Sequence, residues 1–155
     1  MQLLGLVIGL VGLALAVGPV GAAPPQATTI TTDISFDFPS QGTFTATGPI
    51  CSSGTFVDEF IAGGGSPDPT GSYAVIVRKH LTCDDDSGTF TIQFHPQSNP
   101  GNPSTFVESG PWAVVGNSGT GAYTTLSGHG VFGLVVNGTI PETGTETFTG
   151  FMQLD

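Results

Sequence analysis

Residues 75–94 read VIVRKHLTCDDDSGTFTIQF and describe a strand, a short acidic turn and a second strand. In the second strand the apolar residues Phe90, Ile92 and Phe94 alternate with polar ones, which is the pattern of a half-buried strand. To share a face with Leu81 of the first strand, they require a turn with an even number of residues, or a bulge, because a one-residue slip exchanges the faces. The aspartates are natural turn formers. The stretch therefore predicts an antiparallel β-hairpin.

A second hairpin is expected just before it, because residues 54–62 and 72–83 flank a loop rich in glycine and proline. If these two strands pair symmetrically about Pro67, Cys51 falls opposite Cys83. Directly opposed residues on antiparallel strands have Cβ atoms about 4.5–5.5 Å apart, which is close to what a disulfide needs. Two cysteines in an exported chain also favour a disulfide. We therefore expect a Cys51–Cys83 bond.

The same symmetric register sorts the charged side chains of this hairpin. The odd-numbered residues are predicted to face inward, and Glu59 and Lys79 are the charged residues among them. On the outer face, Asp58 and Arg78 become diagonal neighbours and are expected to form a solvated ion pair. His80 is expected to face outward as well. A charged residue inside a small barrel must be paired, hydrated, at the mouth or in contact with a ligand.

Period-two patterns and turn residues recur along the rest of the chain, and no stretch after the first 23 residues has helical spacing. Consecutive short antiparallel strands close into a barrel or pack as a two-sheet sandwich. We expect a single all-β domain over residues 24–155, an eight-stranded antiparallel β-barrel, with a β-sandwich as the alternative. A barrel of eight strands is filled by side chains or holds one small ligand. The expected strands are residues 30–38, 43–47, 54–62, 72–83, 89–95, 106–115, 126–136 and 145–154.

Residues 1–23 differ from the rest of the chain. Residues 3–17 are almost all apolar, and glycine, proline and small residues follow, as in a secretory signal peptide and its cleavage region. The alternative is an uncleaved membrane anchor, since the run approaches the roughly 20 apolar residues that span a bilayer. The glycines and Pro19 favour removal. We therefore expect a secreted protein that has no membrane contact after cleavage.

The chain carries 12 acidic residues and only two basic ones, for a formal net charge of −10. This balance argues against nucleic acid and anionic membranes as partners, since both need a positive surface. A zinc site would need more ligands at closer spacing than this chain supplies. Residues 84–86 are three aspartates, but they lack the alternating ligands and the distal glutamate of a calcium loop. We expect no metal and no cofactor, and the sequence leaves the oligomeric state open.

Three segments carry a family resemblance: TCDDDSGTFTIQF (residues 82–94), WAVV (residues 112–115) and GTGAYTTLSGHG (residues 119–130). They resemble segments of the allene oxide cyclase-like barrel group, which is related to dirigent proteins. The resemblance implies an eight-stranded antiparallel barrel. The cyclases of the group use a glutamate and a cysteine inside the barrel. Glu59 does not align with that glutamate, and the expected disulfide would remove both thiols of this chain. The resemblance therefore does not carry the activity over.

Two functional hypotheses remain. The first is a non-catalytic secreted protein that binds a small apolar molecule in the barrel. The second is an isomerase or cyclase of the allene oxide cyclase kind, which acts on a reactive lipid or phenolic intermediate. The second hypothesis needs a polar group held among apolar walls, and Glu59 is the candidate catalytic carboxylate, with Lys79 and Tyr73 as its companions. The abundance of phenylalanine favours the non-catalytic hypothesis. The expected ligand-binding residues are Tyr73, Val75, Val77, Lys79, Phe90, Ile92 and Phe94.

One further motif concerns the surface. Residues 137–139 read Asn-Gly-Thr and match both a type I′ turn and an N-glycosylation acceptor. The turn is the interpretation that the strand pattern around it favours.

Overall fold

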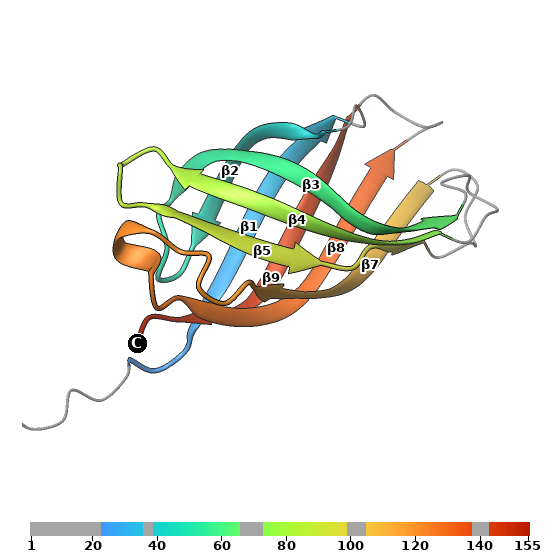
Figure 1. Cartoon of the computed structure of the whole chain (residues 1–155). Coiled ribbons are helices and arrows are strands. Elements are labelled where there is room, and N and C mark those ends of the chain that lie inside the picture. Colours follow the sequence, from blue (N-terminus) through green and yellow to red (C-terminus); the bar gives the residue numbers. More distant parts are fainter. Residues whose placement is uncertain (1–22, 36–38, 66–72, 99–104, 138–142) are drawn as a thin grey trace, which may run out of the picture.

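The computed structural model describes residues 23–35, 39–65, 73–98, 105–137 and 143–155. Its described part is built of β-strands, with one 3-10 turn and no α-helix (Figure 1). None of its described helical residues form a segment long and apolar enough to cross a membrane. The elements are β1 (Gln26–Ser35), β2 (Gln41–Thr47), β3 (Ser53–Gly65), β4 (Tyr73–Cys83), β5 (Thr89–Phe94), β6 (Gln97–Ser98), β7 (Thr105–Val114), η1 (Gly121–Tyr123), β8 (Ser127–Asn137) and β9 (Thr143–Gln153).

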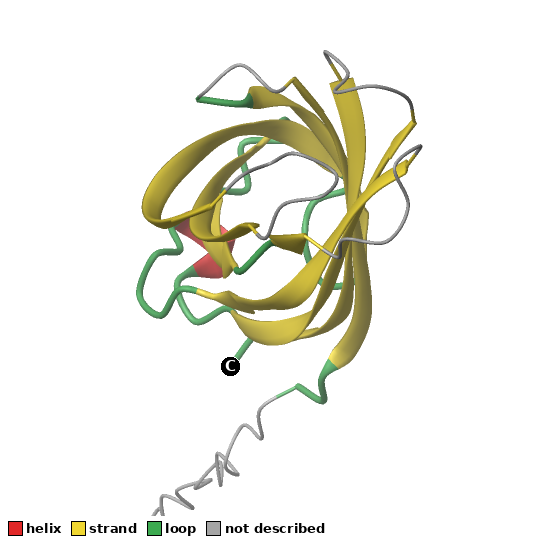
Figure 2. Cartoon of the chain, turned by 90° about the vertical axis from the view of Figure 1, so that its right-hand side faces the viewer, coloured by secondary structure: helices red, strands yellow, loops and turns green. Residues whose placement is uncertain are grey.

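The strands close into a barrel, which Figure 2 shows as a ring. Each strand pairs antiparallel with its neighbours in the order β3-β2-β1-β9-β8-β7-β5-β4, and the β3–β4 pairing closes the ring. The two-residue strand β6 also lies between β4 and β7, so β5 and β6 are one strand interrupted at His95 and Pro96. The prediction of an eight-stranded antiparallel barrel is confirmed, and the β-sandwich alternative is wrong.

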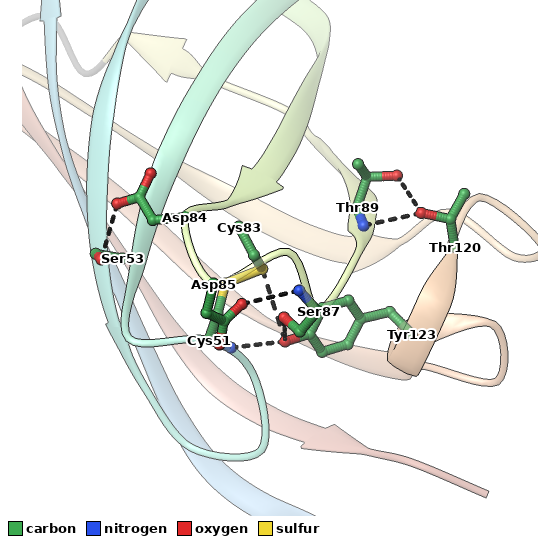
Figure 3. Close-up of a disulfide and its surroundings, with 9 residues drawn as sticks. All are labelled: Cys51, Ser53, Cys83, Asp84, Asp85, Ser87, Thr89, Thr120 and Tyr123. Atoms are coloured by element: carbon green, nitrogen blue, oxygen red, sulfur yellow. Dashed lines mark hydrogen bonds between the residues drawn. A yellow bond between two sulfur atoms is a disulfide. The ribbon is translucent and has the colours of Figure 1, made fainter.

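The two ends of the barrel differ. The turns at residues 48–52, 84–88 and 115–126 gather at one end, at the left of Figure 1, together with the C-terminus. We call this the disulfide end, because the Cys51–Cys83 bond lies there (Figure 3). β8 ends at Asn137, and residues 138 and 139 of the turn expected at residues 137–139 are outside the described part of the chain.

The predicted disulfide is confirmed, with Cα atoms 5.9 Å apart. The Tyr123 hydroxyl accepts a hydrogen bond from the Cys51 backbone N–H at 2.9 Å and lies 2.8 Å from the Ser87 hydroxyl (Figure 3). Both cysteines and Tyr123 are buried. The bond and the phenol together tie the turn before β3, the turn after β4 and η1 into one closed layer at this end.

The predicted β4–β5 hairpin is also confirmed. Leu81 pairs with Phe90, and the Cys83 N–H donates to the Gly88 carbonyl around a turn that holds an even number of residues. Within this turn Asp86 adopts a positive φ of 58°, which aspartate tolerates better than most residues. Phe90, Ile92 and Phe94 consequently lie on the inner wall and are buried.

The predicted register of β3 with β4 is wrong. Asp58 lies opposite Lys79 and Glu59 opposite Arg78, and the register shifts at a bulge between Phe60 and Ala62. The hairpin is therefore not symmetric about the loop, and the even-numbered residues of β3 share a face with the odd-numbered residues of β4. Since both faces of β3 carry apolar residues, its own sequence did not reveal the error.

The consequence is that β3 is turned over relative to the expectation. Its even-numbered residue Phe56 is 2% exposed, whereas Val57 and Ile61 are 44% and 38% exposed. The odd-numbered residues of β4 do face inward as predicted, and Val75, Val77, Lys79 and Leu81 are buried.

Aromatic side chains fill the interior. The rings of Phe94, Phe132 and Phe148 lie within 5.0 Å of one another between centroids. The Trp112 indole N–H donates to the Thr149 carbonyl at 3.1 Å, so the polar atom of this buried side chain is satisfied. Gly54 makes room for a further ring, because a Cβ at this position would collide with Phe44.

We predict that the disulfide supplies a large part of the stability. Replacing both Cys51 and Cys83 by alanine should lower the free energy of unfolding by about 3–4 kcal/mol, because a loop with a sequence separation of 32 is no longer closed in the unfolded chain. Urea unfolding of the double variant and of the reduced wild type should give matching midpoints. A variant as stable as the oxidised wild type would contradict this account.

Candidate functional site: a buried charge cluster inside the barrel

A cluster of charged and polar side chains lies on the inner wall of the barrel. Its members come from strands that are far apart in the sequence, and all are at least nine-tenths buried. They are Thr32 of β1, Ser40 just before β2, Asp58 of β3, Lys79 of β4, Glu108 of β7 and Glu146 of β9. Strand alternation places them there, since each is in phase with buried apolar residues of its own strand.

Lys79 is the centre of this cluster. Its side chain is fully buried, and its Nζ lies 2.7 Å from Asp58 Oδ1 and 3.0 Å from Glu146 Oε2. Asp58 is its direct neighbour across the β3–β4 ladder, whereas β9 lies four strands away in the ring in either direction. The Lys79 side chain therefore crosses the interior and joins opposite walls of the barrel.

Two further contacts hold the ammonium and its partner. Nζ lies 3.6 Å from the centroid of the Phe56 ring, which is a cation–π contact in a desolvated place. The Thr32 hydroxyl donates to Glu146 Oε2 at 2.7 Å, so the carboxylate that receives the ammonium is itself fixed. An ammonium buried in this way is stable only because both carboxylates and the ring surround it.

Burial changes the ionisation of the carboxyls. It raises the pKa of Asp58 to about 6, since desolvation outweighs the opposing effect of the nearby Lys79 ammonium, and Glu146 adds to the rise. Burial also raises the pKa of Glu108 to about 7, with a further contribution from the charge of Glu146. The interior thus holds two carboxyls that change protonation near neutral pH.

Glu108 differs from the other carboxyls because no cation neutralises it. The chain has two basic residues: Lys79 is bound to Asp58 and Glu146, and Arg78 donates from Nε to Gln93 on the outer face. Among the described residues Glu108 forms no ion pair, although it is only 6% exposed. It is the one carboxyl of the cluster that is left without a counterion.

Ser40 is the second unsatisfied group. It is 3% exposed, and its hydroxyl has no hydrogen-bond partner within the described ranges. The Asp58 N–H donates to the Ser40 carbonyl at 2.8 Å, so the two residues are neighbours across the β2–β3 ladder. A buried hydroxyl without a hydrogen-bond partner is uncommon and costs stability. Ser40 is therefore a candidate for a hydrogen bond to a bound molecule.

The predicted ligand-binding residues lie mainly where they were expected. Val75, Val77, Lys79, Phe90, Ile92 and Phe94 are all buried on the inner wall, and their role in binding stays a prediction. Tyr73 is the first residue of β4, and its backbone pairs with Gly65 of β3. Its side chain lies outside the described part of the structure.

The prediction that Glu59 faces inward is wrong. Its side chain is 52% exposed on the outer wall, and its carboxylate lies 3.2 Å from Nε2 of His80. The predicted Asp58–Arg78 ion pair is wrong for the same reason, since the true register buries Asp58 against Lys79. His80 does face outward, as expected.

Sequence reasoning missed Glu108 and Glu146. Each is in phase with aromatic residues of its own strand: Glu108 with Trp112 in β7, and Glu146 with Phe148 in β9. The period-two rule therefore contained the signal. The two glutamates were missed because the face of a strand was assigned from its hydrophobic residues, and a single glutamate on such a face does not change that assignment.

Two other features of the described residues complete the inventory. No three histidine, cysteine, aspartate or glutamate side chains within the described ranges converge as metal ligands. A hollow of about 160 Å³ lies away from the cluster, and its lining includes Pro25, His129 and Phe151.

Comparison with known proteins gives no match: no family model matches the chain, and no curated protein or solved structure does so either. The resemblance to the allene oxide cyclase-like group therefore stays a prediction.

We predict that Lys79 is essential to the fold. Lys79→Met should lower the free energy of unfolding by about 3–5 kcal/mol, because Asp58 and Glu146 stay buried without their shared cation. The neighbouring substitution Arg78→Met is the matched control and should cost less than about 1 kcal/mol, because Arg78 lies on the outer face. Equal losses in urea unfolding would show that the buried ammonium has no special role.

We also predict that stability falls as the pH rises from about 4.5 to about 7. In this window the folded state keeps the Glu108 proton, which the unfolded chain has lost, so the free energy of unfolding decreases with pH. The effect of this one group amounts to roughly 3 kcal/mol.

Glu108→Gln should remove this part of the pH dependence and raise the melting temperature above neutral pH. Some dependence should remain, because the pKa of Asp58 is raised as well. Thermal melts across this pH range would measure the effect, with the exposed Glu59→Gln as control. A profile that Glu108→Gln leaves unchanged would contradict the assignment.

Proposed function

We propose that the protein is a small-molecule-binding β-barrel. Its ligand occupies the part of the interior that lies beyond Lys79 as seen from the disulfide end. The observation that carries the proposal is Glu108, a buried carboxyl in the barrel that has no cation beside it. We place the activity outside the cell, which the buried Cys51–Cys83 disulfide supports.

The energetics of buried charges support this proposal. Well-packed apolar residues in place of a buried ion cluster are often neutral or stabilising, so stability alone is a poor reason to keep one. Perturbed titratable groups in an enclosed place are characteristic of functional sites. Three carboxyls and one ammonium inside so small a barrel therefore favour a role in recognition.

The composition of the inner wall also suits a ligand. The buried residue Leu134 pairs with Glu108 on one side and with Glu146 on the other, so it supplies an apolar wall beside both carboxyls. Apolar walls with a few polar groups are typical of small-molecule sites. An eight-stranded barrel has room for one small ligand at most.

A second candidate function is an isomerase or cyclase of the allene oxide cyclase kind. The raised pKa of Glu108, about 7, favours it, because a general acid or base works best when its pKa lies near the working pH. This candidate rests on Glu108, because the sequence resemblance to that group does not carry the activity over. It differs from simple binding in requiring turnover that Glu108→Gln abolishes while the ligand is still bound.

Native mass spectrometry of protein secreted by its own source tests the proposal. We expect a retained small molecule in the wild type. Leu134→Trp should place a larger side chain on the inner wall beside Glu108 and release this molecule. Val131→Trp should not, because Val131 is 63% exposed on the outer wall of the same strand. Circular dichroism of both variants checks that the barrel is intact. A wild-type protein that carries no ligand, even after incubation with extract from its source, would refute the proposal.

A further inference from the structure

The interior of the barrel is acidic. Among the described residues it contains three carboxyls, those of Asp58, Glu108 and Glu146, against the single ammonium of Lys79. The other basic residue of the chain, Arg78, lies on the outer face. An anionic ligand would therefore meet like charges. A neutral apolar ligand would leave Glu108 without a cation, so that its ionised form would be a costly buried, unpaired charge.

From this arrangement we infer that the ligand is an organic cation: an amine with an apolar body, whose ammonium pairs with the carboxylate of Glu108. This inference rests on the proposed small-molecule binding and names the chemical class of its ligand.

The barrel already shows how its interior holds an ammonium. Lys79 Nζ is enclosed by two carboxylates and by the face of the Phe56 ring, and two further aromatic rings lie 5.6 and 5.9 Å away. Carboxylates combined with aromatic faces are the usual recognition elements for ammonium groups. The chemistry that stabilises the chain's own cation is therefore suited to a second one.

The surroundings of Glu108 repeat these elements. Glu108, Leu134 and Glu146 follow one another across β7, β8 and β9, and the next inward-facing pair on β8 and β9 is Phe132 with Phe148. A cation beside Glu108 thus has a second carboxylate and two aromatic rings among its neighbours on the wall. The apolar body of the ligand would pack against Leu134.

Ser40 provides an independent observation. Its buried hydroxyl lacks a partner among the described residues, and β2, which it precedes, lies across the barrel from β7. A hydroxyl oxygen accepts hydrogen bonds from an ammonium or a hydroxyl of the ligand. A positively charged ligand with hydrogen-bond donors could therefore neutralise Glu108 on one wall and satisfy the Ser40 hydroxyl on the opposite wall.

The test compares three probes with the same alkyl chain: octylamine, 1-octanol and octanoate. Binding to the purified protein is measured by titration calorimetry at about pH 8, where Glu108 with its pKa of about 7 is mainly ionised. About 0.15 M salt screens the attraction of amines to the acidic surface. The variant is Glu108→Gln, and the matched control is Glu59→Gln, which removes an exposed carboxylate from the outer wall.

We expect octylamine to bind at least roughly tenfold more tightly than octanol, and octanoate to bind most weakly. Glu108→Gln should abolish the preference, so that octylamine binds no more tightly than octanol, whereas Glu59→Gln, on the outer wall, should preserve it. Circular dichroism confirms that both variants are folded.

Two results overturn the inference in distinguishable ways. If octanol binds as well as octylamine, or Glu108→Gln keeps the amine preference, the ligand class is wrong while the proposed binding function stands. If none of the probes binds to the wild type, and protein secreted by its own source also retains no small molecule, the proposed binding function itself is wrong.

Discussion

A single ammonium buried inside a closed barrel is the constraint on which much of this structure depends. Lys79 is fully buried, so its charge must be balanced within the interior, because an isolated ammonium in an apolar medium is prohibitively unstable. The partners come from the adjacent strand and from the opposite wall. The same interaction therefore requires that Asp58 face inward and that β9 complete the ring across from β4.

The two ends of the barrel divide the structural and the candidate functional roles. At the disulfide end, the Cys51–Cys83 bond, the Tyr123 hydroxyl and the aromatic core leave the polar groups bonded. Beyond Lys79, Glu108 is buried without an ion pair and the Ser40 hydroxyl is buried without a hydrogen-bond partner among the described residues. These two groups lie in the part of the barrel away from the disulfide, which is where we propose that a ligand binds.

The confirmed disulfide and the mistaken β3–β4 register illustrate the limits of local reasoning. The symmetric pairing brought Cys51 opposite Cys83, but Gly54 occupies that position in the structure and Cys51 lies before β3, in the turn. The bond forms because the closed end of the barrel brings the turn and the strand together. The bulge between Phe60 and Ala62 shifts the register by one residue, so it changes which residues of β3 and β4 share a face. No residue type in the sequence predicted this bulge.

The sequence alone determined the strands, the β4–β5 hairpin, the barrel class and the inward side of β4, because period-two alternation and turn residues act over short distances along the chain. Only the tertiary structure decided which face of β3 is inside and which carboxylates meet Lys79. Both faces of β3 carry apolar residues, so alternation did not select one of them. Glu146 reaches Lys79 only when the first and last strands pair, as they do where Thr32 bonds to Glu146 over a separation of 114 residues. Contacts across a closed barrel depend on ring closure and register, and neither is encoded by the pattern of any one strand.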